Sequence, residues 1–154
     1  MQITKFSDYA LRILIHLSAN HGQRETAKEI AGRQGVSFNH LAKVSQWLAA
    51  EGYVEGTRGR GGGMVLARPA GEISIGALLR KSESGSALVE CMRADGGACP
   101  LTPACGLTGI LAGAQEAFFA HLDDKTLADV IDSGPAVLNL IRSMAEIENS
   151  DNTN

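Results

Sequence analysis

All three cysteines of the chain, Cys91, Cys99 and Cys105, lie within one short stretch. An odd number of thiols cannot all be used in disulfides within one chain, so at least one remains free for other chemistry. Grouped thiols are typical ligands of a metal ion or an iron–sulfur cluster, and are also typical of redox-sensitive sites. A catalytic cysteine is not favoured, because a single nucleophile would not require three.

The spacing of these cysteines narrows the choice of metal site. Seven residues separate Cys91 from Cys99, and five separate Cys99 from Cys105. Zinc ribbons use paired Cys-x-x-Cys motifs, and ferredoxins use runs of cysteines only two or three residues apart. The pattern therefore predicts an open set of three sulfur ligands that needs a fourth ligand from elsewhere.

Three helices are predicted upstream of the cysteines, in the first third of the chain. Thr26 followed by Glu29 has the pattern of a capping box, and Ser37 is a typical N-cap residue. Apolar residues recur at helical intervals on either side of these positions. Together these signals predict helices over 5–19, 27–34 and 38–51.

The second and third of these helices have the spacing of a DNA-binding helix-turn-helix. Ala31 is small where the helices must approach closely, and Gly35 can adopt the positive φ of the turn. Leu41 and Val44 then return the third helix to the core. The polar residues left on its outer face suit base edges and phosphates in a major groove: Ser37, Asn39, His40, Lys43 and Gln46. The alternative is an ordinary amphipathic pair of helices whose polar face is only solvated.

A β-hairpin is predicted directly after the third helix. Two short apolar runs, 53–55 and 64–66, flank a glycine-rich stretch, which is typical of two strands joined by a turn. Arg58 and Arg60 at its tip are suited to phosphates or to a narrow minor groove. A nucleotide-binding loop is excluded, because no Lys-Ser/Thr pair follows and the tip joins strand to strand.

Charge is distributed unevenly along the 154 residues, whose net charge is −3. Residues 1–70 contain nine Lys or Arg and five Asp or Glu, whereas residues 71–154 contain five and twelve. A basic front half and an acidic rear half fit a DNA-binding head on a non-binding body, although chance scatter of charge is the alternative. No catalytic constellation is recognisable, so we do not expect an enzyme.

The expected environment follows from hydropathy. No apolar run approaches the roughly 20 residues needed to cross a bilayer, and the start of the chain lacks the pattern of a signal peptide. We therefore expect a cytoplasmic protein that does not associate with a membrane.

Several motifs resemble the iron–sulfur winged-helix transcriptional repressors, a family with nitric-oxide-sensing (NsrR), cluster-status-sensing (IscR) and iron-sensing (RirA) branches. The likeness covers about residues 1–132 and is nearest to the NsrR branch. It implies a homodimer that binds double-stranded operator DNA, carries one cluster per subunit, with 4Fe–4S favoured over 2Fe–2S, and responds to nitric oxide. The motifs are Asp8-Tyr9-Ala10-Leu11-Arg12, Gly35-Val36-Ser37, Asn39-His40-Leu41, Gly52-Tyr53-Val54, Arg58-Gly59-Arg60-Gly61-Gly62-Gly63, Pro103-Ala104-Cys105 and Thr126-Leu127-Ala128-Asp129.

By this resemblance the three cysteines hold the cluster, and Asp8 of the partner subunit is the fourth ligand. The histidine ligand of IscR-like proteins is not available, because Thr108 occupies that position. The interval between Cys91 and Cys99 is longer than is usual in the NsrR branch and closer to that of RirA. An iron- or cluster-status-responsive regulator therefore remains an alternative, as does a metal-free thiol redox regulator. For Asp8 the alternative is a surface ion pair with Arg12, four residues later on one helix.

We therefore expect a mainly α fold with a small β-hairpin wing. A winged helix-turn-helix DNA-binding domain would span 1–70. A connecting helix, expected over about 77–83, and the cysteine-rich loop would together span 71–106. A long dimerisation helix and C-terminal helices would follow over 107–148, ahead of a disordered tail over 149–154.

Overall fold

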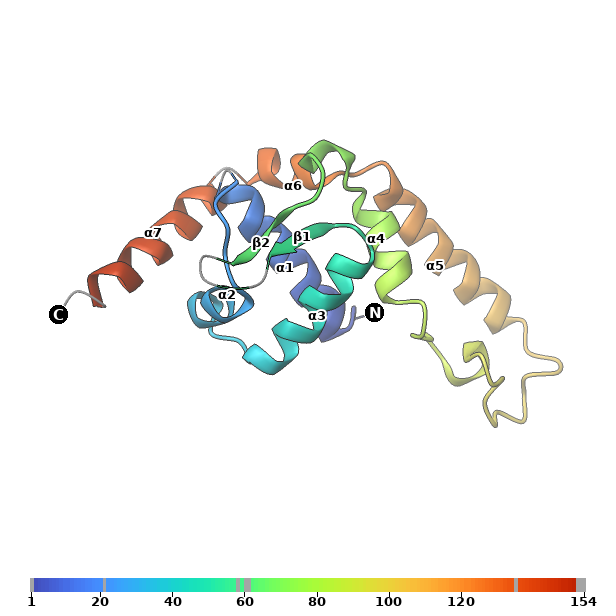
Figure 1. Ribbon diagram of the computed structural model, residues 1–154. Coiled ribbons are helices and arrows are strands. Elements are labelled where there is room, and N and C mark those ends of the chain that lie inside the picture. The colour runs from blue at the N-terminus through green and yellow to red at the C-terminus, as the bar shows by residue number, and fades with distance from the viewer. Residues whose placement is uncertain (1, 21, 58, 60–61, 135, 152–154) are drawn as a thin grey trace.

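The N-terminal part of the chain folds into three helices and a β-hairpin, as predicted (Figure 1). The computed structural model describes residues 2–20, 22–57, 59, 62–134 and 136–151. Helix α1 spans Lys5–Ala19, α2 spans Ala27–Gln34 and α3 spans Phe38–Ala50. Strands β1 (Val54–Thr57) and β2 (Gly63–Leu66) pair antiparallel, with Val54 opposite Leu66. The winged helix-turn-helix fold expected from the sequence is thus confirmed.

The core of this domain lies between α1, α2 and α3. Ile13 and Leu14 of α1 are fully buried, as are Ile30 of α2 and Leu41 and Leu48 of α3. Each of these side chains belongs to the apolar stripe that its helix shows in the sequence. Burial of one large aliphatic side chain contributes about 1.5–3 kcal/mol of transfer free energy, so this cluster is the main source of stability for the domain.

Local signals set the ends of these helices. The Thr26 hydroxyl accepts a hydrogen bond from the Glu29 N–H, and the Glu29 carboxylate accepts one from the Thr26 N–H, so the predicted capping box is confirmed. Gly35 has φ 62°, the left-handed conformation expected at the turn. Ser37 occupies the N-cap position of α3, but its side chain makes no capping hydrogen bond.

The hairpin is attached to the chain segment that precedes α2. Glu25 and Met64 form an isolated antiparallel bridge: the Met64 N–H donates to the Glu25 carbonyl at 2.8 Å, and the Glu25 N–H donates to the Met64 carbonyl at 3.2 Å. Gly63 permits this approach, because a β-carbon there would lie 2.9 Å from the Glu25 backbone. Residue 25 is thus joined to β2 by a single bridge.

The second half of the chain begins with a 3-10 turn, η1 (Ala70–Glu72), and α4 (Ile75–Ser82). Helix α4 starts two residues earlier than the sequence suggested, because the Ser74 hydroxyl caps it by accepting a hydrogen bond from the Ala77 N–H. It packs along α5 (Leu107–Asp123), and Gly76 makes the contact close: a β-carbon at Gly76 would lie 2.7 Å from the Asp123 α-carbon.

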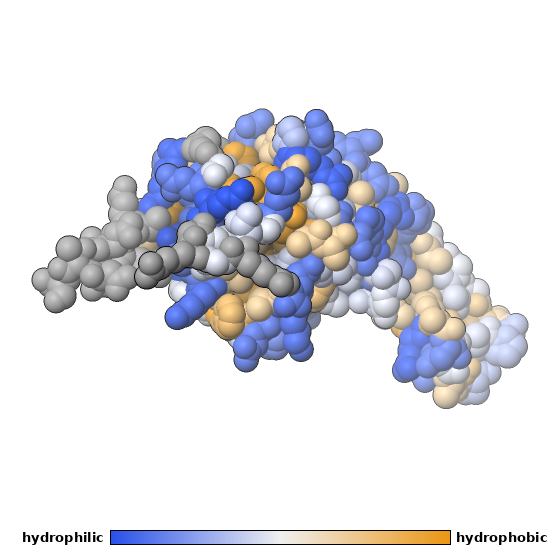
Figure 2. All heavy atoms as spheres, in the orientation of Figure 1, coloured by the Kyte–Doolittle hydropathy of each residue, from blue (hydrophilic) through white to orange (hydrophobic). Residues whose placement is uncertain are grey.

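Helix α5 projects from the body of the molecule (Figure 1). Of its seventeen residues only Phe119 is buried, whereas Leu107 and Ile110 are 52% and 70% exposed. Figure 2 shows apolar residues on the surface of this projecting end. No helix in the described part of the chain is long and apolar enough to cross a bilayer.

Two further helices follow, the short α6 (Leu127–Ser133) and the longer α7 (Ala136–Asp151). Helix α7 contacts α1 and α2, so it lies against the helix-turn-helix domain. It also corrects one expectation, since the tail predicted to be disordered from residue 149 is helical as far as Asp151. Residues 152–154 lie outside the described part of the chain.

Candidate DNA-binding surface and cysteine segment

Helix α3 presents the polar side chains that the sequence singled out for contact with DNA. Ser37, Asn39, His40, Lys43 and Gln46 are all exposed. Asn39, Lys43 and Gln46 follow one another at helical intervals and form a stripe along the outer face of α3. The His40 ring instead stacks on Tyr9 of α1, with the ring centroids 6.5 Å apart. The exposed stripe carries one cation between two neutral amides.

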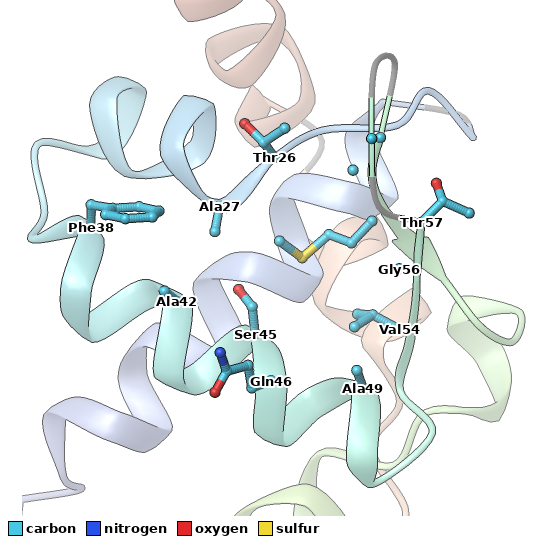
Figure 3. A pocket seen from close by; sticks show the side chains of 14 residues that line it. Thr26, Ala27, Phe38, Ala42, Ser45, Gln46, Ala49, Val54, Gly56 and Thr57 are labelled. Carbon is cyan, nitrogen blue, oxygen red and sulfur yellow. The ribbon is translucent and has the colours of Figure 1, made fainter.

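A groove of about 540 Å³ lies beside this stripe, between α2, α3 and the hairpin (Figure 3). Gln46 belongs to both the stripe and the groove. Ser45, Thr26 and Thr57 add hydroxyl groups to its walls, and Phe38 closes the end near the turn. Sequence reasoning missed these lining residues, because their common orientation appears only once the hairpin is folded against α3.

The hairpin tip carries the two arginines predicted to reach DNA. Arg58 and Arg60 lie outside the described residues, so their contact with DNA stays a prediction. Another cation lies where β1 ends, next to the turn: the exposed Arg24 donates a hydrogen bond to the hydroxyl of Thr57, the last residue of β1, at 3.0 Å. Arg24 had not been selected from the sequence, since nothing local indicates that it meets β1.

A buried ionic cluster lies behind this surface. The Glu25 carboxylate accepts hydrogen bonds from His16 Nε2 at 2.5 Å, from Arg33 Nη1 at 2.6 Å and from the Asn20 amide. Burial alone would raise the pKa of Glu25, but the hydrogen bonds and charges of His16 and Arg33 outweigh it and hold the pKa below its ordinary value. The carboxylate is therefore ionised at neutral pH.

The cysteine segment, residues 83–106, joins α4 to α5 and extends beyond the N-terminal end of α5 (Figure 1). It contains one 3-10 turn, η2 (Glu90–Met92), and is otherwise irregular, as predicted. All three thiols are free and half-buried. Cys91 Sγ lies 3.2 Å from the Thr108 hydroxyl in the first turn of α5. No other contact of a thiol with a polar side chain is found among the described residues.

The donor set of this segment suits an iron–sulfur cluster in kind. Sulfur ligands are those that such clusters require, and no disulfide competes for them. Within the described part of one chain, however, no three His, Cys, Asp or Glu side chains gather closely enough to hold a metal ion. The segment would therefore have to close around the group, with any fourth donor coming from elsewhere.

Asp8, the predicted fourth ligand, lies in the first turn of α1. Its carboxylate pairs with Arg12 at 2.9 Å, and both side chains are well exposed. The ion pair expected from their spacing is thus confirmed. A partly exposed carboxylate in a surface pair, worth about 0.3–0.5 kcal/mol on a helix, is readily diverted to another partner.

The beginning of α1 is also fastened to the end of α4. The Glu83 side chain, on a residue only 8% exposed, accepts hydrogen bonds from the Thr4 N–H and the Thr4 hydroxyl, both at 2.8 Å, and from the Ser7 hydroxyl. Burial would raise the pKa of Glu83, but these three donors, together with the Ser86 side chain, lower it below its usual value. The first turn of α1 and the start of the cysteine segment are thereby held together.

Comparison with known proteins gives consistent results. The family model described as Rrf2, iron-dependent transcriptional regulator, matches residues 3–133. The regulator named NsrR from Geobacillus kaustophilus is 42% identical over 92% of this chain and 97% of its own length. NsrR from Bacillus subtilis is 40% identical over 92% of this chain and 98% of its own.

Solved structures of the same kind share the fold. T. potens IscR superimposes with a TM-score of 0.66 and 25% identity, covering 87% of this chain and 88% of that one. CymR, the global cysteine regulator of B. subtilis, gives a TM-score of 0.65 and 26% identity, covering 86% and 98%. The resemblance found in the sequence motifs is thus confirmed.

Proposed function

Because the chain belongs to the Rrf2 family of transcriptional regulators, we propose that it is a homodimeric repressor whose affinity for operator DNA is controlled by an iron–sulfur cluster. Nitric oxide is the proposed signal, in keeping with the relatives named NsrR. The observation that carries the proposal is that all three cysteines are free and lie in the one segment that connects α4 to α5.

DNA binding is assigned to α3 and the hairpin. Helix α3 would enter the major groove, with Ser37, Asn39, Lys43 and Gln46 available to base edges and phosphates. His40, which stacks on Tyr9 of α1, would contact DNA on the side of α3 nearer α1. Arg58 and Arg60 of the hairpin would contact phosphates or the minor groove, so the groove between α3 and the hairpin would face the sugar–phosphate backbone.

Dimerisation is assigned to α5. A helix that leaves Leu107 and Ile110 in solvent is incompletely buried in a single chain, and a second copy offers the same apolar stripe. Two-fold pairing through α5 would hold the two α3 helices about 34 Å apart, so that they could enter successive major grooves. It would also bring α1 of one protomer within reach of the other's cysteine segment.

The proposed cluster site consists of Cys91, Cys99 and Cys105 with Asp8 of the partner subunit. When bound, the cluster would supply a linkage between the two chains that nitric oxide can destroy, because a carboxylate is a weaker partner for iron than a thiolate. Arg12 would release the Asp8 carboxylate for this purpose. We favour 4Fe–4S over 2Fe–2S, with one cluster per subunit.

The chain has the connections needed to carry such a signal to DNA. The cysteine segment continues directly into α5, and Glu83 fastens its other end to the first turn of α1. Ordering or releasing the segment would therefore shift the α1 helices, and with them the spacing of the two α3 helices. A coupling free energy of about 1–3 kcal/mol would change DNA affinity roughly 5- to 150-fold.

The test is purification without oxygen, followed by iron and sulfide analysis and by DNA binding with and without nitric oxide. The proposal predicts a brown protein that releases DNA when nitric oxide is added. Alanine at Cys91, Cys99 or Cys105 should abolish both the colour and the response, whereas Asp8→Ala should leave a more labile cluster. DNA binding by all three cysteine variants that is as tight as that of the wild-type protein would contradict it.

The same experiment separates the alternatives. A colourless protein whose DNA binding changes with reversible disulfide formation would indicate a metal-free thiol regulator, for which three free thiols are also suited. A brown protein that ignores nitric oxide but responds to iron chelation would indicate an iron- or cluster-status sensor. Native mass spectrometry of the anaerobic protein would then distinguish 4Fe–4S from 2Fe–2S.

A further inference from the structure

One buried carboxylate, that of Glu25, connects the hairpin to both helices that support α3. Its side chain is 8% exposed and is bound by His16 of α1, which is fully buried, and by Arg33 of α2. Asn20 at the end of α1 donates a further hydrogen bond. Buried ions are costly to maintain unless they are paired and hydrogen-bonded, so this cluster adopts one arrangement rather than several.

The backbone of the same residue holds the hairpin. The two hydrogen bonds between Glu25 and Met64 join it to β2, and Gly63 brings the strand against it without a side chain between them. The neighbouring Arg24 reaches across to Thr57 of β1 at 3.0 Å. A shift of the hairpin against α1 and α2 must therefore either displace the Glu25 carboxylate or break the bridge to Met64.

We propose that Glu25 is a positioning residue for DNA binding: its buried carboxylate fixes the hairpin relative to α3, so that both engage one duplex together. The inference rests on the proposed function, in which the hairpin and α3 each contact DNA. Binding through two elements costs less ordering entropy when their separation is already set. Glu25 itself does not touch the nucleic acid.

The sign of the effect separates this role from simple electrostatics. Glu25→Gln removes a negative charge from the DNA-binding domain, which on charge alone would strengthen binding to a polyanion. The positioning role predicts the opposite. The glutamine amide presents N–H groups where His16, Arg33 and Asn20 also donate, so the cluster rearranges and the hairpin loses its fixed position.

The experiment uses the full-length protein, purified without oxygen, and a duplex that the wild-type protein selects from a random-sequence pool. Glu25→Gln should weaken binding by about five- to tenfold and lower the slope of log affinity against log salt by about one, as when one phosphate contact is lost. Asn20→Ala, which changes no charge, should act in the same direction and carries the test if Glu25→Gln does not fold. Asp129→Asn is the control, since it also removes one negative charge, but from an exposed helix cap on α6 that has no hydrogen bond to the hairpin among the described residues.

A double-mutant cycle with Arg58→Ala locates the effect. If Glu25 acts through the hairpin, Glu25→Gln should weaken binding little further once Arg58 is replaced. Multiplicative losses in the double variant, or wild-type affinity and salt slope in folded Glu25→Gln and Asn20→Ala, would overturn the inference while leaving the proposed function intact. Failure of the wild-type protein to select any duplex would overturn both.

Discussion

Replacement of Glu83 by alanine should destabilise the protein, because this carboxylate fastens the first turn of α1 to the end of α4. The residue is 8% exposed and accepts three hydrogen bonds from Thr4 and Ser7. After truncation the two hydroxyls, 3.1 Å apart, can bond to each other, and Ser7 keeps Ser82 at 2.7 Å. The Thr4 N–H is then the donor left without an acceptor.

The expected loss of unfolding free energy follows from this one unpaired donor. An orphaned donor costs about 1–3 kcal/mol when it is fully buried, and the Thr4 N–H is part-buried. The hydrogen bonds to a charged acceptor are lost as well, so we expect the free energy of unfolding to fall by about 2–3 kcal/mol. For a chain of this length that corresponds to a melting temperature lower by about 4–12 °C. Glu83→Gln keeps a carbonyl acceptor for the Thr4 N–H and should lose less than half as much.

The assay is urea unfolding followed by circular dichroism at pH 7, at one fixed protein concentration because dimerisation would add to apparent stability. Glu72→Ala is the matched control, since Glu72 is an exposed glutamate in η1, and it should stay within about 0.5 kcal/mol of wild type. If Glu83→Ala is no less stable than Glu72→Ala, the fastening of α1 to α4 by this carboxylate is refuted.

Gly76→Ala adds a β-carbon against the backbone of α5 and should cost about 1–3 kcal/mol of unfolding free energy by overpacking, whereas Gly71→Ala, which faces open space, should be neutral in the same urea assay. Because the folded pKa values of Glu25 and Glu83 lie below their ordinary values, the stabilisation that these two carboxylates contribute should be constant from pH 7 down to the unfolded glutamate pKa of about 4.3 and then fall as the pH drops further. Glutamine at either position should flatten that decline, and a wild-type urea midpoint unchanged between pH 7 and pH 3 would contradict it. Arg58→Ala should weaken DNA binding and reduce the salt slope by about one if the residue contacts one phosphate; an unchanged slope in a titration at several salt concentrations would remove Arg58 from the interface.

Local signals in the sequence were sufficient for most of the fold. Helical periodicity, the Thr26 capping box and the glycine-rich hairpin all involve residues within a few positions of one another, and the structure confirms each of them. The start of α4 was misplaced because the capping role of Ser74 was overlooked. The end of α7 was misplaced because a polar sequence does not by itself terminate a helix.

Long-range contacts could not be read in the same way. Glu83 meets Thr4 across 79 positions, and Glu25 meets Met64 across a turn, two helices and a strand. Nothing near Glu83 or Glu25 in the sequence distinguishes it from a solvated glutamate. The thiols, by contrast, were conspicuous from composition and spacing, although no three His, Cys, Asp or Glu side chains of the described residues gather closely enough to hold a metal ion.

The contact between Gly63 and Glu25 limits how this gene can change. Every amino-acid replacement that a glycine codon reaches by one base change adds a β-carbon. At Gly63, whose φ is 151°, that carbon would lie 2.9 Å from the backbone of Glu25. The first residue of β2 thus has almost no tolerance for mutation, although it belongs to a hairpin rather than to the hydrophobic core. Divergence in the reach of the hairpin would have to arise in the turn that follows Thr57, because the strand pair is fixed where β2 begins.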